Sequence, residues 1–189
     1  PQVHVDMQIT NRVVNLVEDG IDVALRVRPS LDDSGSLIVK SLGSSQTLLV
    51  GSPTLLDRQG RPATVADLVR IDTVSMSASD GRANWLLLGP EGRSHEWIHQ
   101  PRLVADDLLT LKQAVFSGVG AGLLPDYMCR ADLLAGNLTP VLPGWNPRPG
   151  LMHAVFASRR GLAPAVRYFL DFLGERLDNT SVRAVAKSV

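Results

Sequence analysis

Apolar side chains stand at every second position from Val3 to Ile9, with polar side chains between them. This period of two predicts a half-buried strand over 3–9, at the edge of a sheet. Mostly apolar runs predict further strands at 21–27, 37–41, 47–53, 71–76, 103–105, 120–124, 138–142 and 151–157. Pro140 places the strand 138–142 at a sheet edge. The runs 85–88 and 96–98 flank a Gly-Pro-Glu-Gly turn and predict a hairpin.

Helices are predicted where apolar residues recur at helical spacing or where a residue typical of helix starts precedes the segment. They cover 11–19, 54–60, 64–68, 108–117, a segment that starts near Pro125, and 163–177. Thr10 or Asn11 would cap the first helix, and Thr64 the third. Gly20 supplies the left-handed residue that ends helices. Residues 178–189 are expected to form a frayed tail.

Strands that alternate with helices predict an α/β fold with mixed, mostly parallel sheets and helices outside them. The length of 189 residues suits one domain or two small lobes. A hydrophobic content of 44% and a charged content of 20% are ordinary for a globular protein. The formal net charge is zero, which argues against DNA binding by this chain alone, because non-specific binding needs clustered Lys and Arg.

Cys129 is the single cysteine of the chain, which excludes an internal disulfide and an intramolecular two-cysteine redox switch. Such cysteine usage fits a reducing compartment, and Cys129 is interpreted as a small buried hydrophobic residue. No apolar run reaches the length of a transmembrane helix. The chain begins with Pro1 rather than Met, so the lack of a visible signal peptide carries no information.

Three segments carry a resemblance to a known family. The first runs from Leu16 to Val27 and places Glu-Asp-Gly directly before an apolar strand. The second, Asp107 to Tyr127, contains Ser-Gly-Val-Gly-Ala-Gly and Leu-Leu-Pro-Asp-Tyr, and the third, 158–164, precedes a Phe-rich helix. Together they make the chain, over about Pro1 to Leu177, similar to the effector-binding domain of LysR-type transcriptional regulators.

The resemblance implies a two-lobed fold of the periplasmic-binding-protein type (type II), with crossing strands near 47–53 and 149–157. Lobe I would comprise 1–52 and 150–178, lobe II 53–149, and residues 179–189 a tail. The family's DNA-binding winged helix-turn-helix is absent from this chain and would precede Pro1. The first strand and helix of lobe I would precede it as well, so lobe I is expected to be incomplete.

The implied activity is binding rather than catalysis, with no cofactor and no membrane. A small-molecule effector would enter the interlobe cleft of a cytoplasmic homodimer or homotetramer and change the geometry of its lobes or subunits, which moves the DNA-binding domains. A periplasmic solute-binding protein of the same architecture is the alternative, and an upstream signal peptide would decide for it. A zinc hydrolase is a third hypothesis.

In two-lobed α/β folds, ligands bind beyond the carboxyl ends of strands. This rule selects five candidate ligand-binding residues by position: Arg28, Ser75, Ser77, Asp106 and Pro125. Several of them align with cleft segments of the family. Arg28 is the candidate partner of an effector carboxylate, with an exposed surface arginine as the alternative.

His95-Glu96-Trp97-Ile98-His99 matches the HExxH pattern of zinc proteases. That chemistry requires a helix, so that the two histidines share one face and the glutamate activates water. The turn before His95 and Pro101 after His99 favour a strand instead. On a strand the two histidines would be about 13 Å apart at about 3.3 Å per residue, so a metal site is not expected.

Gly118-Val119-Gly120 resembles a nucleotide-binding loop, but its order is helix, loop, strand, the reverse of such loops. The glycines are therefore interpreted as a helix C-cap and turn. Asp106 and Asp107 are a candidate carboxylate pair, and helix capping at 108 is the favoured interpretation. Trp85, Trp97 and Trp145 are expected to pack inside the protein.

Overall fold

The computed structural model describes residues 3–12, 14–30, 37–157 and 162–185, with side chains up to Leu177. The chain divides into two compact units. Unit 1 comprises Pro1–Ser45 and Gly150–Val189, and unit 2 comprises Gln46–Pro149. The chain therefore passes from unit 1 to unit 2 and back once. Within the described residues, no helix is both long enough and apolar enough to cross a membrane.

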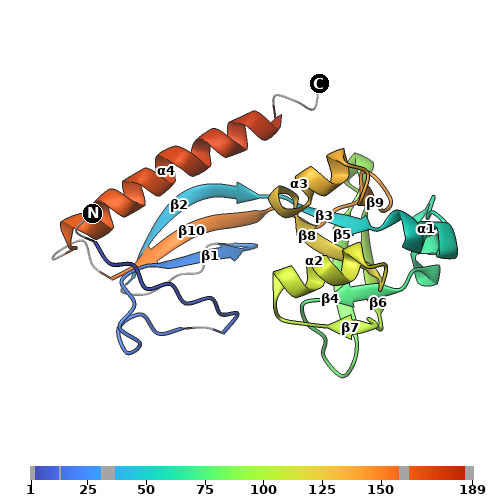
Figure 1. The fold of residues 1–189 in the computed structure, drawn as a ribbon, viewed down its shortest axis with the longest axis horizontal. Helices are drawn as coiled ribbons and strands as arrows, with labels where there is room; N and C mark the ends of the chain where they lie inside the picture. The colour runs from blue at the N-terminus through green and yellow to red at the C-terminus, as the bar shows by residue number, and fades with distance from the viewer. Residues whose placement is uncertain (1–2, 13, 31–36, 158–161, 186–189) are drawn as a thin grey trace. The chain divides into compact units, whose positions relative to one another are not determined.

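Unit 1 is a three-stranded antiparallel sheet with one long helix (Figure 1). Its strands, in the order β1-β10-β2, are β1 (Ala24–Arg28), β10 (Gly150–Phe156) and β2 (Ile38–Ser45). Helix α4 (Pro164–Val185) packs on β2, and its Leu170 joins Leu42, Ala154 and Phe156 in the core. Lys40 fixes the helix, because its Nζ donates to the Leu170 carbonyl at 3.1 Å and to Asp171 at 2.8 Å.

The start of unit 1 differs from the sequence prediction. Residues 3–9 form no strand and are exposed, with Ile9 at 87%. The predicted helix 11–19 is also wrong, because its described residues form only a turn, in which Leu16 alone is buried. The strand predicted over 21–27 begins at Ala24. A period of two makes a strand only where a neighbouring strand supplies hydrogen bonds, and none pairs with 3–9 within the described residues.

The C-terminal prediction also needs correction. Helix α4 continues to Val185 instead of fraying at residue 178. Residues 178–185 contain neither proline nor glycine, so no residue in this stretch forces the helix to end. The rest of the predicted tail, 186–189, and the segment 158–161 lie outside the described residues.

Unit 2 contains a five-stranded sheet in the order β7-β4-β8-β3-β9. Its strands are β3 (Thr47–Gly51), β4 (Thr73–Ser75), β7 (Leu103–Val104), β8 (Ala121–Pro125) and β9 (Thr139–Pro140). Strand β4 runs parallel to β7 and β8, while β3 is antiparallel to β8 and β9. The α/β class is confirmed and the sheets are mixed. Fewer strand pairs are parallel than predicted, because β3 is antiparallel to its neighbours and the strands of unit 1 are antiparallel to one another. The edge position of the strand with Pro140 is confirmed.

The helices of unit 2 begin and end where local chemistry predicts. They are α1 (Pro53–Gln59), the 3-10 helix η1 (Val65–Arg70), α2 (Leu108–Phe116) and α3 (Asp126–Leu134). Ser52 caps α1 by accepting a hydrogen bond from the Leu55 amide. The Asp67 carboxylate accepts hydrogen bonds from the amide and the hydroxyl of Thr64 and so caps the start of η1. These two hydrogen bonds also lower the pKa of Asp67.

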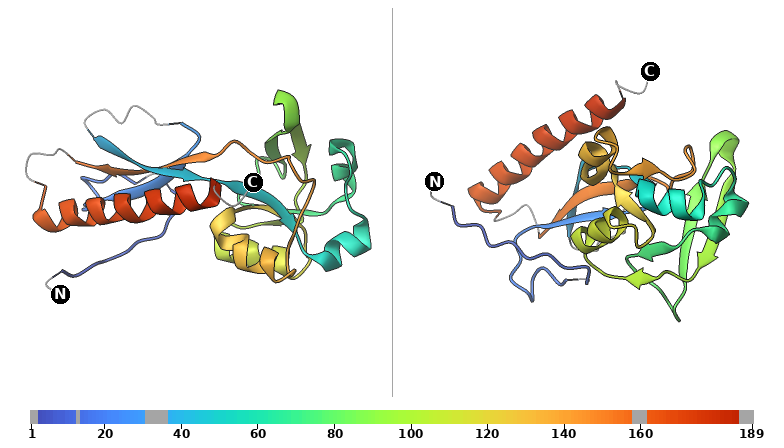
Figure 2. Two further views of the ribbon diagram at one scale, coloured as in Figure 1. Left: turned by 90° about the horizontal axis from the view of Figure 1, so that it is seen from above. Right: turned by 45° about the vertical axis from the view of Figure 1, so that its right-hand side comes forward.

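Two core clusters lie on opposite faces of this sheet. Adjacent residues of β3 and β8 alternate between them, Leu49 and Leu123 in the first, Val50 and Leu124 in the second. Helices α2 and α3 cover the second cluster. The first receives side chains from α1, η1 and the predicted hairpin. The hairpin is confirmed as β5 (Ala83–Leu88) and β6 (Ser94–His99), drawn in green in Figure 2. The short 3-10 helix η2 (Pro90–Gly92) forms the tip of the hairpin.

Candidate functional site

Four of the five candidate residues lie at one edge of the sheet of unit 2. Strands β4, β7 and β8 are parallel, so their carboxyl ends meet at the same edge. Ser75 ends β4, Asp106 lies two residues beyond β7, and Pro125 ends β8. Ser77 follows β4 by two residues. This edge, formed by residues 75–77, 105–107 and 125–126, is called the carboxyl edge below.

Ser75 organises the loop that follows β4. Its side chain is 4% exposed, and its hydroxyl donates to the carbonyl of Ser77 at 2.9 Å. Its own carbonyl accepts from the amide of Ala105 at 3.1 Å, which ties the loop to the residue after β7. Ser77 is exposed. Ser75 therefore shapes the edge, while Ser77 presents a polar side chain at its surface.

The two adjacent carboxylates have different roles. Asp107 caps α2, because its Oδ2 accepts from the Thr110 amide and hydroxyl, both at 2.6 Å. Those two hydrogen bonds lower the pKa of Asp107, the hydroxyl contributing most. Asp106 is exposed beside it. The capping interpretation of this pair is confirmed for Asp107.

Pro125 stands where three elements meet. It ends β8, precedes the first residue of α3, and pairs with Thr47 at the start of β3. The Asp126 amide donates to the carbonyl of Gln46 at 2.9 Å. Pro125 is the N-cap residue of α3, and its side chain has no oxygen that could accept a hydrogen bond from the first turn. The first turn of α3 therefore brings backbone N–H groups without a side-chain cap to this edge. Sequence reasoning missed Gln46 and Thr47, because the pairing of β3 with β8 joins Thr47 to Pro125, 78 positions along the chain.

Arg28 belongs to unit 1, whereas the other four candidate residues belong to unit 2. It ends β1 in unit 1, is half-buried, and pairs with Leu151 of β10. The carboxyl edge of unit 2 does not include it.

The HExxH segment is a strand, as predicted. His95 and His99 lie on the face of β6 that also carries the buried Trp97, whereas Glu96 lies on the opposite, exposed face. The Glu96 carboxylate accepts from the amide of Asn84 at 2.6 Å. A glutamate on the other face cannot activate a water held by the two histidines. Among the described residues, no group of three His, Cys, Asp or Glu side chains is placed to bind a metal.

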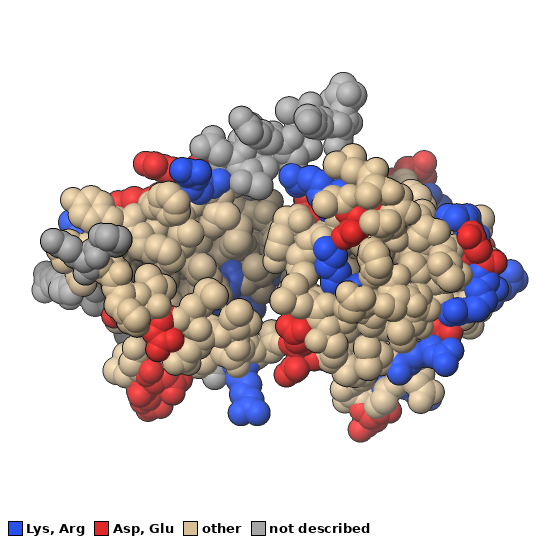
Figure 3. Space-filling model, viewed as in Figure 1, with Lys and Arg blue, Asp and Glu red and all other residues tan. Residues whose placement is uncertain are grey.

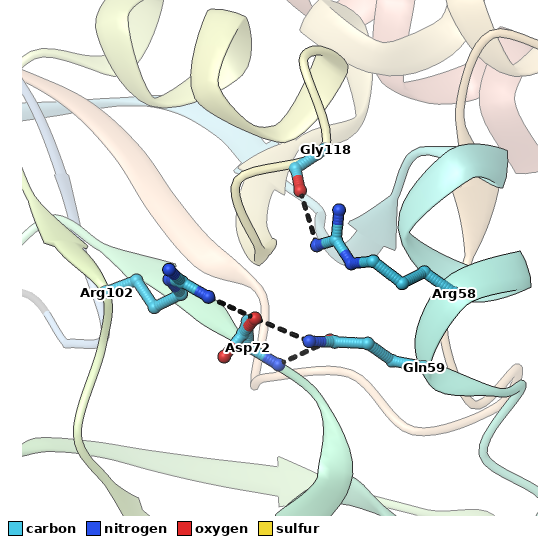
Figure 4. Close-up of polar contacts among 5 residues, drawn as sticks. All are labelled: Arg58, Gln59, Asp72, Arg102 and Gly118. Atoms are coloured by element: carbon cyan, nitrogen blue, oxygen red, sulfur yellow. Dashed lines mark hydrogen bonds and ion pairs between the residues drawn. The ribbon is translucent and has the colours of Figure 1, made fainter.

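A polar network occupies the opposite edge of the sheet (Figure 4). The Asp72 carboxylate accepts from Arg102 at 2.9 Å and from the Gln59 amide, while the Asp72 backbone N–H donates to Gln59 at 2.9 Å. Burial acts to raise the pKa of Asp72, but the hydrogen bonds from Arg102 and Gln59 outweigh it and lower that pKa. Arg58 donates to the carbonyl of Gly118 at 3.1 Å. The network ties α1 to β4, β7 and the end of α2.

Gly118 ends α2 as predicted. Its φ is +75°, its amide donates to Val115, and the Val119 amide donates to Ala114. These are the two hydrogen bonds of a Schellman motif. The glycines of this loop therefore end a helix rather than hold a phosphate.

A shallow depression lies next to this network. Its volume is about 260 Å³, and it is lined by Gln59, Gly60, Arg61, Pro62, Asp67, Arg70 and Ile71. The charged side chains around it pair with each other, Arg61 with Asp57 at 3.1 Å and Arg70 with Asp67 at 3.8 Å. Acidic and basic side chains also lie next to each other on the face in Figure 3, in keeping with the zero net charge.

Comparison with known proteins places the chain in a family. Residues 1–178 match the sequence model of the LysR substrate binding domain. An HTH-type transcriptional regulator of Xanthomonas campestris pv. campestris (strain 8004) is 34% identical over 183 residues, 94% of this chain and 52% of the relative. The HTH-type transcriptional regulator CrgA of Neisseria meningitidis serogroup C is 28% identical over 180 residues, 95% of this chain and 59% of the relative.

Solved structures agree with this assignment. The full-length structure of the Vibrio cholerae virulence activator AphB, a member of the LTTR family, matches with a TM-score of 0.79 and 25% identity, over 93% of this chain and 59% of that one. The regulatory domain of Neisseria meningitidis CrgA matches with a TM-score of 0.75 and 26% identity, over 89% of this chain and 81% of that one.

The chain belongs to the LysR substrate binding domain family. The resemblance seen in its three sequence segments is thereby confirmed, and with it the two-lobed periplasmic-binding-protein-like fold. The chain spans about half to three-fifths of the length of the first curated relatives, at 52% and 59%. Because these relatives are transcriptional regulators, the alternative of a periplasmic solute-binding protein is not favoured.

Proposed function

We propose that this chain is the effector-sensing part of a DNA-binding transcriptional regulator, and that it works by binding a small molecule rather than by catalysis. Membership of the LysR substrate binding domain family and the regulator names of its relatives support this. DNA contact is assigned to a helix-turn-helix outside this chain, in keeping with the HTH-type names of relatives of which the match covers only 52% and 59%. The working protein is a cytoplasmic homodimer or homotetramer.

We place the effector contacts of unit 2 at the carboxyl edge, with Ser77 and Asp106 as polar contacts and Pro125 as an apolar one. The observation that carries this placement is the arrival of separate chain segments at the ends of three parallel strands, where open α/β sheets bind ligands. Thr47 reaches the same edge through its pairing with Pro125. Ser75 acts indirectly, through its hydrogen bond to the Ser77 carbonyl. Arg28 stays a predicted contact from unit 1.

The proposed mechanism is a shift of population between conformations. An effector regulates only if it binds one conformation of the protein more tightly than the other. A tenfold difference in affinity corresponds to about 1.4 kcal/mol of coupling. The residues at the strand ends could contact the effector in one conformation of the protein and not in the other.

A ligand screen followed by substitution at one exposed serine tests the proposal. The screen selects small metabolites that raise the melting temperature of the chain. Calorimetry then measures the affinity of each selected metabolite for the wild type and for Ser77→Gln. Ser117→Gln is the matched control, because Ser117 is also exposed but follows α2, at the opposite edge of the sheet. We expect at least about a tenfold loss of affinity, about 1.4 kcal/mol, for Ser77→Gln alone. Equal affinities of the two variants would contradict the placement.

A further inference from the structure

His99 lies in an aromatic setting that no part of the proposed function uses. It is the last residue of β6, and its ring stacks on Trp97 with centroids 4.2 Å apart and an interplanar angle of 30°. Trp85 of β5 approaches the same ring edge-on, at 4.4 Å and 70°. Both indoles are almost fully buried, at 7% and 8% exposure. The imidazole thus packs against two tryptophans that also contact each other, with ring centroids 5.4 Å apart, and that belong to the first core cluster.

The hydrogen bonds of His99 define its protonation. Its Nδ1 is 3.2 Å from the carbonyl oxygen of Trp97. A carbonyl only accepts, so Nδ1 carries the hydrogen and Nε2 of the neutral ring is left without one. Nε2 is buried and has no hydrogen-bond partner among the described residues. A proton added to this ring therefore arrives at a buried atom with no acceptor beside it among the described residues.

Among the described residues, no charged side chain contributes to the shift in the pKa of His99. The face of β5 beside His99 carries Ala83, Trp85 and Leu87, and the inner face of β6 adds one more titratable group, His95. The first core cluster contributes apolar side chains from β3, α1, η1, β8 and residues 141–145. Acidic Glu96 lies on the other face of the hairpin.

We propose that His99 is a pH-sensitive latch, which holds the β5–β6 hairpin on the core of unit 2 while its imidazole is neutral and releases it when Nε2 is protonated. Indole faces attract a cation, whereas burial opposes it. Burial lowers the pKa of His99 from its ordinary value of 6.5, and the hydrogen bond to the Trp97 carbonyl is a smaller effect in the opposite direction.

The sign of the pH effect follows from this direction. Above pH 6.5 the ring is neutral in the folded and unfolded chain, and the latch is intact. As the pH falls below that value, the unfolded chain binds a proton that the packed hairpin rejects, so the hairpin loses stability. The loss is complete once the pH is below the pKa of the packed ring.

Tryptophan fluorescence of the 189-residue chain tests the latch, because release of the hairpin exposes the buried Trp85 and Trp97 to water and moves their emission to longer wavelength. The chain is titrated from pH 8 downward, with His99→Gln as the variant and His95→Gln as the control on the same face of the same strand. We expect a shift to longer wavelength with its midpoint below pH 6.5 in the wild type and in His95→Gln, and its loss in His99→Gln. The same transition in His99→Gln would overturn the proposal.

A second measurement keeps the test independent of how His99→Gln folds. The ring protons of the four histidines are titrated by NMR in the wild-type chain, and the signal of His99 is assigned as the one that survives separate substitution of His4, His95 and His153. A midpoint below 6.5 supports the latch. A midpoint at or above 6.5 overturns it.

Discussion

Two glycines show how differently the same residue is used in this chain. A Cβ on Gly120 would stand 2.7 Å from the carbonyl carbon of Thr73, so β4 and β8 approach too closely there for any side chain. A Cβ on Gly174, within α4, would meet only the end of Lys40 at 3.7 Å. We predict that Gly120→Ala destabilises the chain by about 1–3 kcal/mol and that Gly174→Ala stabilises it by about 0.5–1 kcal/mol.

Urea unfolding curves of the wild type and the two variants measure both effects. A wild-type midpoint for Gly120→Ala would show that the strand spacing in unit 2 is looser than described. A destabilised Gly174→Ala would show that α4 has no room on that face.

Cys129 behaves as a buried hydrophobic residue rather than as a redox sensor. It has no exposed surface, and burial raises the pKa of its thiol to about 11. Only the thiolate attacks disulfides and peroxides. We predict that an aromatic disulfide reagent leaves Cys129 unmodified in the native chain at pH 7.5 and modifies it fully in urea. Rapid modification of the native chain would contradict the packing of α3 on the second core cluster.

At the scale of elements, an ion pair joins α2 to α3. Lys112 Nζ is 2.8 Å from Asp132 Oδ2, with side-chain exposures of 30% and 18%. The hydrogen bond from Lys112 lowers the pKa of Asp132 from its ordinary value of 3.8. The pair therefore stabilises the chain above pH 3.8, and its contribution is lost as the pH falls through the lowered pKa.

A double-mutant cycle with Lys112→Met and Asp132→Asn measures this pair. We predict a coupling of about 0.5–1 kcal/mol at pH 7, which decreases as the pH falls through the lowered pKa of Asp132. The control is the more exposed pair Arg130–Asp126 within α3, for which about 0.3 kcal/mol is expected. A coupling that is no larger for Lys112–Asp132, or that does not decrease in acid, would contradict its role in joining the helices.

Sequence reasoning worked best where structure depends on neighbours in the chain. The cap at Asp107, the glycine at 118 and the hairpin turn are each decided within about five residues, and all were predicted. The predictions of a strand at 3–9 and a helix at 11–19 were wrong. The spacing of apolar residues shows which side chains could pack together, but it does not show whether another element is present for them to pack on. Val17 has helical spacing yet is 74% exposed.

The candidate site divides in the same way. Rules about strand ends selected Ser75, Ser77, Asp106 and Pro125, and parallel pairing brings their segments to one edge. The role of Ser75 as a support for Ser77 depends on a side-chain rotamer, which no sequence pattern reports. Thr47 was missed because antiparallel pairing between β3 and β8 joins residues 78 positions apart, at Thr47 and Pro125.

At the scale of the whole molecule, the two units differ in their cores. Among the residues that the structure describes, unit 1 has one cluster of four buried residues beside a three-stranded sheet. Unit 2 has two clusters, of eleven and eight described residues, on the two faces of a five-stranded sheet. Local opening is easier where fewer apolar contacts are buried. We therefore predict that amides of β1 and β2 exchange with deuterium faster than those of β3 and β8, and equal protection would contradict this.

The central claim is that an effector binds at the carboxyl edge of unit 2. The most direct measurement is amide NMR of the chain during titration with a small molecule that raises its melting temperature. We predict that the largest shifts fall on Ser75–Ser77, on Asp106 and at the start of α3, near Asp126. Shifts confined to the depression between Gln59 and Ile71, or to residues of unit 1, would contradict it.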